Sequence, residues 1–301
     1  MQTLLSLVIP TFGKHDVLEL VLDSLIKELD FDYEIIIVDG TPGNVDQFKQ
    51  KLLKFAPHAL YIAQPDFGES HAINIALLRA KGLLIKVITD DDAFNFARIK
   101  HQAEFLLQNP DIDILGSDGI ALSGIEGYAQ GYLGYEEEYS KYQRFHTPFA
   151  FCGLGLMLRR EVLALSGLFD TFYTRADLSF TYRITGLGLR LAWDYTPSYC
   201  RILHPKSVSI TYNDRLEAEG ALADWYYRDR FTIPEVSMKI SSAVLIPYAK
   251  QRRSELINCP SPSADANLGP SSYTARHSEI YSQAMQYLRQ ATLKQIVWPN
   301  G

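Results

Sequence analysis

Short apolar runs alternate with segments of helical periodicity along the first 115 residues. Short runs of mostly apolar, often β-branched residues predict strands at 4–9, 33–39, 59–63 and 83–89. The consecutive isoleucines of the second run are typical of a strand that is buried on both faces. Between these runs apolar residues recur every three or four positions, which predicts helices. Strict alternation of strand and helix indicates a mostly parallel sheet with right-handed crossovers, and therefore the α/β class.

The pattern becomes irregular after Gly116. Residues 119–143 are rich in Gly and Tyr, and we expect them to form a mobile aromatic segment over a binding site. Periodicity returns at 149–170 and continues to a predicted strand at 189–195, after which 201–209 reads as a loop.

The composition narrows the class of protein. A chain of 301 residues, 47% of them hydrophobic, suffices for one large domain or two small ones. The net charge is −6 and no long run of Lys or Arg occurs, which argues against nucleic acid as a partner. Cys152, Cys200 and Cys259 are too far apart for a zinc site and odd in number for a disulfide framework.

With no charged leader and no apolar run near the ~18 residues of a membrane helix, we expect a cytoplasmic protein that at most touches the inner face of a membrane.

Polar clusters follow each of the first predicted strands. They are Pro10 to Phe12, Asp39, the segment "QPDFGES" and the triplet Asp90 to Asp92. The carboxyl ends of parallel strands open onto one crevice, where ligands bind in this class of sheet. The sequence therefore predicts a site along this edge.

The aspartate triplet calls for a positive partner, because adjacent carboxylates raise one another's pKa. A divalent cation is the simplest candidate, since Mg²⁺ and Mn²⁺ prefer oxygen ligands. In an extended segment Asp90 and Asp92 would face one ligand and Asp91 would point away. The alternative is that an aspartate caps a helix beginning near Phe94, although capping requires only one.

Four segments resemble, in the same order, the landmarks of family 2 glycosyltransferases with the GT-A fold. They are "LVIPTFGKHDVLELVLDSL", "YEIIIVDG", "GESHAINIALLRAKGLLIKVITDDDA" and "GLFDTFYTRADLSFTYRITGLGLR", and they cover about residues 4–210. The resemblance implies a GT-A (Rossmann-like) central sheet flanked by helices. It also implies an inverting transferase that moves a sugar from a nucleotide-diphosphate sugar, with UDP as the leading nucleotide, to a hydroxyl acceptor.

The resemblance assigns the nucleotide to the first strand ends. Pro10, Thr11 and Phe12 match the motif that lies against the base and ribose, and Asp39 matches the acid that accepts from the base. The family usually has a second acid where this chain has Gly40, which leaves base specificity open.

The third landmark covers the loop and helix that close over the nucleotide in the family. Gly68 and Asn74 match this element, while Ile73 replaces a frequent arginine. Neutralisation of the diphosphate would then depend more on a metal ion.

The triplet matches the DXD motif of the family. The resemblance implies Mn²⁺ or Mg²⁺ as cofactor, Asp92 as the direct ligand, and Asp90 as a water-mediated or ribose contact. Asp90 and Asp91 would also contribute to the nucleotide-sugar site. His204 matches a position that offers a metal or diphosphate ligand, although a lone histidine is more often structural.

The fourth landmark carries the expected general base. The family has a Glu-Asp pair here, and this chain has Ala176 and Asp177. One carboxylate is enough for a single displacement, so Asp177 is the predicted base. The alternative is that Asp177 only caps the following helix.

These assignments divide the chain into three parts. Residues 1–115 form the nucleotide-sugar-binding half and 116–235 the acceptor-binding and catalytic half of one domain. Residues 236–301 form a helical extension with a Pro/Ser linker at 260–272 and an amphipathic helix at 274–298. That helix docks on the domain, mediates homodimerisation or touches a membrane, with docking as the default.

The predicted activity is a metal-dependent glycosyl transfer to a saccharide, lipid-linked or small-molecule acceptor, as in bacterial surface polysaccharide or glycoconjugate assembly. Two alternatives remain open at this stage. One is a nucleotide-sugar or glycan-binding module without turnover, which the missing acids at 40 and 176 favour. The other is a sugar-nucleotide pyrophosphorylase, although the first strand is not followed by the Gly-rich basic loop of those enzymes.

Overall fold

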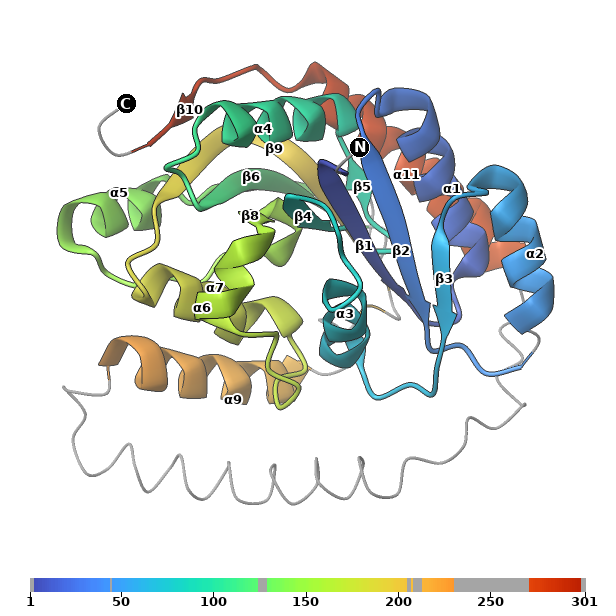
Figure 1. Cartoon of the computed structure of the whole chain (residues 1–301), viewed down its shortest axis with the longest axis horizontal. Coiled ribbons are helices and arrows are strands. Elements are labelled where there is room, and N and C mark those ends of the chain that lie inside the picture. Colours follow the sequence, from blue (N-terminus) through green and yellow to red (C-terminus); the bar gives the residue numbers. More distant parts are fainter. Residues whose placement is uncertain are drawn as a thin grey trace.

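The N-terminal half of the central sheet is parallel. A computed structural model describes residues 3–43, 45–123, 129–204, 207, 213–229 and 271–298. Its first strands are β1 (Leu5–Thr11), β2 (Tyr33–Asp39), β3 (Leu60–Ala63) and β4 (Leu84–Val87). β1 lies between β2 and β4, β3 pairs with β2, and all three pairings are parallel, so the α/β prediction is confirmed (Figure 1).

The other half of the sheet is mixed. A parallel pair, β6 (Ile114–Ser123) and β9 (Leu191–Leu203), is joined to β4 by the short antiparallel strand β8 (Met157–Arg159). Three further strands pair antiparallel with this half: β5 (Ala93–Phe94), β7 (Ala129–Leu133) and β10 (Ile296–Val297). The strand order is therefore β10-β9-β6-β8-β4-β1-β2-β3.

Two hydrophobic clusters cover the two faces of the sheet. Alternate residues of β1 belong to different clusters: Leu7 and Ile9 to one, Val8 to the other. This period of two explains why the predicted strands are uninterrupted apolar runs. The helices of the first cluster are α1 (His15–Glu28), α2 (Val45–Phe55), α4 (Phe96–Gln108) and α11 (Ser271–Gln290). Those of the second are α3 (Glu69–Leu77), α5 (Glu136–Phe145) and α7 (Ala176–Gly186).

The aromatic segment after Gly116 is more regular than predicted. β6 continues to Ser123, β7 returns beside it, and α5 follows. Tyr139 and Tyr142 of α5 are buried and stack near Trp193, so these aromatic residues form core rather than a mobile cover. The prediction was wrong because the apolar partner of α5, the fully buried Trp193, is distant in sequence and meets these side chains only in the folded chain.

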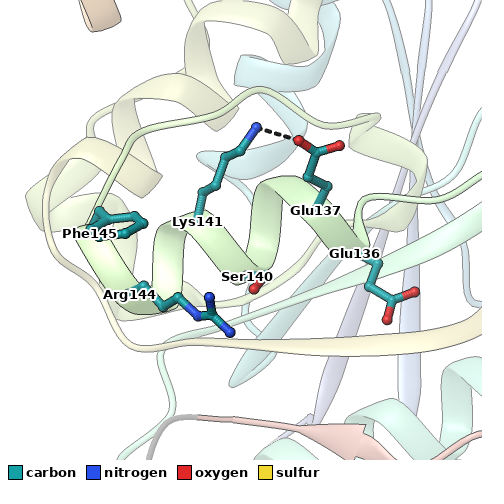
Figure 2. A pocket seen from close by; sticks show the side chains of 6 residues that line it. All are labelled: Glu136, Glu137, Ser140, Lys141, Arg144 and Phe145. Atoms are coloured by element: carbon teal, nitrogen blue, oxygen red, sulfur yellow. Dashed lines mark hydrogen bonds and ion pairs between the residues drawn. The ribbon is translucent and has the colours of Figure 1, made fainter.

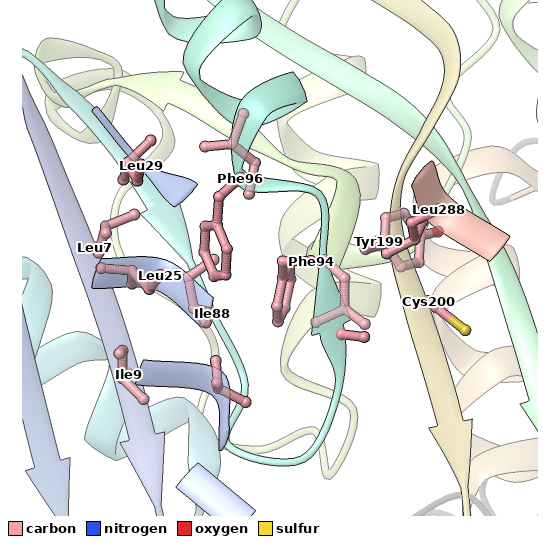
Figure 3. Close-up of a cluster of buried hydrophobic side chains, with 14 of the residues drawn as sticks. Leu7, Ile9, Leu25, Leu29, Ile88, Phe94, Phe96, Tyr199, Cys200 and Leu288 are labelled. Atoms are coloured by element: carbon pink, nitrogen blue, oxygen red, sulfur yellow. The ribbon is translucent and has the colours of Figure 1, made fainter. Parts of the chain in front are cut away.

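The C-terminal helix docks on the domain. α11 packs against α1, β5 and β9, and Ile280, Met285 and Leu288 are buried there (Figure 3 shows Leu288 beside Tyr199 and Cys200). The predicted helix is too long, because α11 ends at Gln290 and Ile296 lies on β10. The predicted linker at 260–272 lies outside the described residues except for its end, where α11 has begun.

Shorter elements complete the second half. They are the 3₁₀ turns η1 (Gly153–Gly155) and η2 (Arg160–Val162), α6 (Leu163–Ser166), α9 (Asn213–Asp224) and the π-helical turn η3 (Trp225–Asp229). β9 also extends through the start of the segment that was predicted as a loop at 201–209.

A buried ion pair connects α4 to β9. Arg98 donates from Nε and Nη2 to the two carboxylate oxygens of Asp194, each at 2.7 Å, and Gln102 donates to Asp194 Oδ2 at 2.8 Å. Asp194 is fully buried and Arg98 nearly so. Both partners are hydrogen-bonded, so the pair is tolerated in the core, but neither charge can be left alone there.

We expect Asp194→Ala to lower the free energy of unfolding by about 3–5 kcal/mol, because Arg98 would remain buried without its partner. Denaturant unfolding followed by circular dichroism measures this change. Asp23→Ala is the control: it breaks the exposed pair with Lys27, and we expect a change within about 1 kcal/mol. Equal effects of the two substitutions would contradict the role of burial.

Candidate active site

The polar strand ends converge at one edge of the sheet. In the parallel register Thr11 lies beside Asp39, and Asp39 lies beside Ala63. β4 runs alongside β1, so the triplet that follows β4 reaches the same edge. The predicted convergence is therefore present in the fold.

Asp90 and Asp91 share a cation that the chain itself supplies. Lys14, at the start of α1, places Nζ 2.6 Å from Asp91 Oδ2 and 3.4 Å from Asp90 Oδ1. Thr11 donates from Oγ1 to Asp90 Oδ2 at 2.8 Å. His204 Nε2 lies 2.9 Å from Asp91 Oδ2. Asp91 is thus the carboxylate at which an ammonium and an imidazole meet.

Asp92 faces β9 instead. Its Oδ1 accepts from the backbone N–H of Ile202 and its Oδ2 from Thr89 Oγ1, both at 2.7 Å. The prediction that Asp90 and Asp92 face one ligand while Asp91 points away is therefore wrong. The three residues form a bend between β4 and β5, where the two-residue alternation of a strand does not hold.

The triplet does not cap the following helix. α4 begins at Phe96, and its N-cap is Asn95, whose side chain accepts from the N–H of Arg98 at 2.9 Å. The capping alternative is excluded for α4, and the burial of all three aspartates needs another reason.

Burial and mutual repulsion separate the acidities of the three carboxyl groups. Burial acts to raise the pKa of Asp91, but Lys14 and His204 outweigh it, and that pKa falls below its usual range. Burial raises the pKa of Asp90 and Asp92, and the charge of Asp91 adds to both shifts. One carboxylate therefore stays ionised while its neighbours hold protons more readily.

The position of His204 follows from strand pairing. Ala93 of β5 pairs antiparallel with Cys200 of β9, and β9 ends at Leu203. This pairing carries the end of β9 to the triplet, so His204 meets Asp91 across more than a hundred residues of sequence.

A second histidine comes from the C-terminal helix. The ring of His277 in α11 lies 6.0 Å from that of His204 in an edge-on arrangement. Desolvation lowers the pKa of His277 to about 4, so the ring is neutral at pH 7, and it also interacts with the backbone of Asp91. Sequence reasoning missed this residue because only tertiary packing brings α11 to the triplet.

Asp39 is held by a separate set of donors. Tyr61 donates to its Oδ2 at 2.5 Å, His15 Nε2 lies 2.7 Å from the same oxygen, and the N–H of Thr41 donates to Oδ1 at 2.8 Å. Burial acts to raise the pKa of Asp39, but these hydrogen bonds outweigh it and the pKa is lowered. The His15 ring stacks on Phe48 at 3.5 Å.

The first motif presents one open aromatic ring. Pro10 and Thr11 are buried at the end of β1, whereas Phe12 is 46% exposed. An exposed ring directly after Thr11, which pairs with Asp39 in the sheet, suits stacking on a flat ligand.

Gly68 precedes α3, and Asn74 lies within this helix. Gly68 has φ +95° at the N-cap, a conformation that favours glycine. Asn74 donates from Nδ2 to the carbonyl of Phe169 and accepts from the Phe169 N–H on Oδ1, each at 2.8 Å. The amide of Asn74 thus joins α3 to the segment before α7.

Glu69 is a carboxylate of this edge that the sequence placed in the polar segment "QPDFGES" without assigning it a role. The residue is exposed, yet the protein around it desolvates its carboxyl, and the charge of Asp177 adds to this effect, raising the pKa to about 8. Asp91 raises it further and Lys14 opposes. Glu69 therefore lies within electrostatic range of both the triplet and Asp177.

Asp177 lies in the first turn of α7. The helix begins at Ala176 and its N-cap, Arg175, makes no side-chain cap hydrogen bond. Asp177 accepts on Oδ2 from the N–H of Gly153 at 2.8 Å. This contact orients the carboxylate toward the η1 turn, and it differs from the capping contact considered above.

Two surface depressions lie apart from the acidic edge. One, of about 520 Å³, runs along α5, where Lys141 pairs with Glu137 (Figure 2). The other, of about 380 Å³, lies between β7, β9 and the end of α11. Neither is lined by any residue assigned above to the candidate site.

The sequence of residues 6–164, slightly more than half of the chain, matches the family described as Glycosyl transferase family 2. The chain belongs to this family. The expected family is therefore confirmed. The match includes the acidic triplet and ends before Asp177 and His204.

Two curated relatives of this chain are themselves called uncharacterized glycosyltransferases. EpsJ of Bacillus subtilis is 31% identical over 38% of this chain and 33% of its own length. RT0329 of Rickettsia typhi is 22% identical over 46% of this chain and 43% of its own length. The chain thus matches less than half the length of either relative.

Solved structures confirm the GT-A fold of this family 2 chain. TarS 1–349 from S. aureus in complex with UDP-GlcNAc has a TM-score of 0.54 at 13% identity and covers 99% of both chains. PcManGT, a mannosyltransferase from Pyrobaculum calidifontis in complex with GDP-Man and Mn²⁺, has a TM-score of 0.56 at 17% identity, covering 96% of this chain and 82% of that chain.

The described residues lack two features. No group of three or more His, Cys, Asp or Glu side chains within them is arranged to hold a metal ion. In the same part of the chain, every helix is too short or too polar to cross a membrane.

We expect Asn74→Ala to lower the free energy of unfolding by about 1–3 kcal/mol, because both backbone groups of Phe169 lose their partner. Denaturant unfolding measures the loss, and calorimetry with nucleoside diphosphates measures binding in the same protein. Unchanged stability together with lost nucleotide binding would show that Asn74 contacts the ligand instead.

Proposed function

We propose that this chain transfers a sugar from a nucleoside-diphosphate sugar to a hydroxyl acceptor by single displacement. The observation that carries the proposal is the gathering of acidic groups from separate elements at one sheet edge in a family 2 chain. Asp39 comes from β2, Asp91 from the end of β4 and Asp177 from α7. Fold alone does not give an activity, so the roles below rest on these side chains.

The donor side is assigned to the ends of β1 and β2. Phe12 is exposed and available to stack on the base, and Asp39, whose pKa is lowered, is the carboxylate that would accept from it. Pro10 and Thr11 shape the wall behind it, and Gly68 lets the chain turn into α3 at the same edge. The structural neighbours form complexes with UDP-GlcNAc and GDP-Man, which supports a nucleotide sugar as donor. The proposal therefore includes both UDP and GDP as the nucleotide of the donor.

Asp91 and His204 are the residues that fit a divalent cation. Asp91 Oδ2 and His204 Nε2 lie 2.9 Å apart, a carboxylate and an imidazole at the spacing of neighbouring ligands. Mn²⁺ and Mg²⁺ commonly take one or two protein ligands and complete their shell with water and phosphate oxygens. When bound, such an ion would offset charge on the diphosphate. Asp92 is less suited, because Ile202 and Thr89 hold both of its oxygens, whereas Lys14 and His204 contact the same oxygen of Asp91 and an ion bound there would take the place of the Lys14 contact.

Asp177 is the proposed general base. Its Oδ2 is fixed by Gly153, which leaves Oδ1 to take the proton of the acceptor hydroxyl. As the proton leaves, the acceptor oxygen bonds to the anomeric carbon and the bond from that carbon to the diphosphate breaks. The nucleoside diphosphate departs with the bonding electrons, and the anomeric configuration inverts.

We propose only the chemical class of the acceptor, which is a hydroxyl group on a saccharide, a lipid-linked molecule or a small molecule. The proposal also includes a role in bacterial surface polysaccharide or glycoconjugate assembly, in the cytoplasm or at the membrane's inner face; the two matched relatives are bacterial proteins.

Replacing Asp177 with Asn should reduce turnover by about 10²–10⁴-fold and leave nucleotide binding unchanged, because only proton transfer is lost. Release of nucleoside diphosphate from UDP-GlcNAc or GDP-mannose, measured with a panel of hydroxyl acceptors, reports turnover. Asp111→Asn, in an exposed pair with Arg190, is the control and should behave as wild type. A protein that binds the donor without releasing nucleotide in any condition would be a binding module, and the proposed transfer would be wrong.

The metal assignment is tested by two neighbouring substitutions. Mn²⁺ added with UDP or GDP should raise the melting temperature of the wild type and of Asp92→Asn, since an asparagine still fits between Ile202 and Thr89. Asp91→Asn should abolish the Mn²⁺-dependent part of the shift. The opposite result for the two variants would make Asp92 the ligand, as the sequence resemblance implied.

A further inference from the structure

Lys86 is a charged side chain in the core of the molecule. It lies on β4, four residues before Asp90, and is fully buried. A lysine at such a position is costly unless its amine is hydrogen-bonded. Desolvation lowers its pKa to about 7, and the interactions with Cys152 and Asp194 oppose this shift. Nothing in the proposed chemistry uses this residue directly, so its presence in the core needs its own explanation.

The amine of Lys86 binds the backbone of the η1 turn. Its Nζ donates to the carbonyl oxygen of Leu154, and to that of Leu156 at 3.3 Å. The same turn is pressed against β6: a Cβ added to Gly155 would lie 2.4 Å from the carbonyl oxygen of Ser117. The turn is therefore held from β4 on one side and has little room to move on the other.

The segment that leads into this turn is hydrogen-bonded along the length of α7. Three backbone N–H groups spaced two apart donate to three side chains spaced four apart on the helix. The pairs are Phe149 to Thr185 Oγ1 (3.1 Å), Phe151 to Thr181 Oγ1 (3.3 Å) and Gly153 to Asp177 Oδ2 (2.8 Å). An extended chain advances about as far in two residues as a helix does in four, so the two spacings match. The last of these hydrogen bonds, from Gly153 to Asp177, is the contact that orients the Asp177 carboxylate.

We propose that Lys86 is a positioning residue that sets the orientation of the Asp177 carboxylate through the turn 153–156. This inference rests on the proposed function of Asp177. The contacts run from Lys86 to the carbonyls of Leu154 and Leu156, through the turn to the Gly153 N–H, and from there to Asp177. Because β4 leads into the bend that holds the aspartate triplet, the same strand positions the donor side and the base relative to one another.

The test is Lys86→Met, which keeps an unbranched apolar stem but removes the amine and with it both hydrogen bonds. Small misplacement of a catalytic group can cost up to about 100-fold in rate, so we expect kcat to fall roughly 10–100-fold. The Kd for UDP or GDP, whichever binds the wild type, should stay within about twofold, because Asp39 and Asp91 are untouched. Circular dichroism confirms that the variant is folded.

Arg159→Met is the matched control. Arg159 on β8 also donates to backbone carbonyls, those of Ile112 at 2.7 Å and Asn109 at 3.0 Å, but this contact lies at the end of the sheet away from Asp177. We expect it to lose stability while kcat stays near the wild-type value. A merely structural role for Lys86 predicts the same behaviour in both variants.

A double substitution separates this inference from the proposed function. If Lys86 acts through Asp177, adding Lys86→Met to Asp177→Asn should cause no further loss of kcat. Wild-type turnover in Asp177→Asn would overturn the assigned base itself. A large effect of Asp177→Asn together with a wild-type kcat in folded Lys86→Met, or fully additive losses, would overturn only the role of Lys86. If Lys86→Met does not fold, Lys86→Gln is used: it is one bond shorter, cannot reach both carbonyls, and carries the same expectations.

Discussion

The site depends on one buried carboxylate that stays ionised. Asp91 is nearly inaccessible, yet its Oδ2 is met by both the Lys14 ammonium and the His204 ring. These partners come from the start of α1 and the end of β9, so the charge is satisfied only when three distant segments are in place. An isolated buried charge costs several kcal/mol, and the geometry of the sheet edge is therefore coupled to this contact.

Two other buried cationic side chains connect segments that are separate in sequence. Lys86 joins β4 to the η1 turn, and Arg98 joins α4 to β9. Replacing such groups with apolar residues of similar size need not cost stability, so we interpret their value as specificity: each fixes the register of one segment against another. In this chain the fixed segments are those that carry the triplet, His204 and Asp177.

The C-terminal helix belongs to the same arrangement. α11 contributes apolar residues to the cluster shared with α1 and α4, and it also brings His277 against His204. The neutral His277 ring adds no charge at pH 7 and is itself buried next to His204. A segment near the end of the sequence thus supports chemistry assigned to its beginning.

The sequence by itself determined the alternating strands and helices of the first half and the edge at which their polar ends meet, because local periodicity and parallel pairing leave few other outcomes. It also determined the family. Only the tertiary structure decided which aspartate faces His204, because the triplet lies in a bend where strand alternation fails. The sequence places Glu69 in a polar strand end and Lys86 in a predicted strand, but it does not indicate their partners or those of His277, because these partners are distant in sequence and long-range packing alone brings them together.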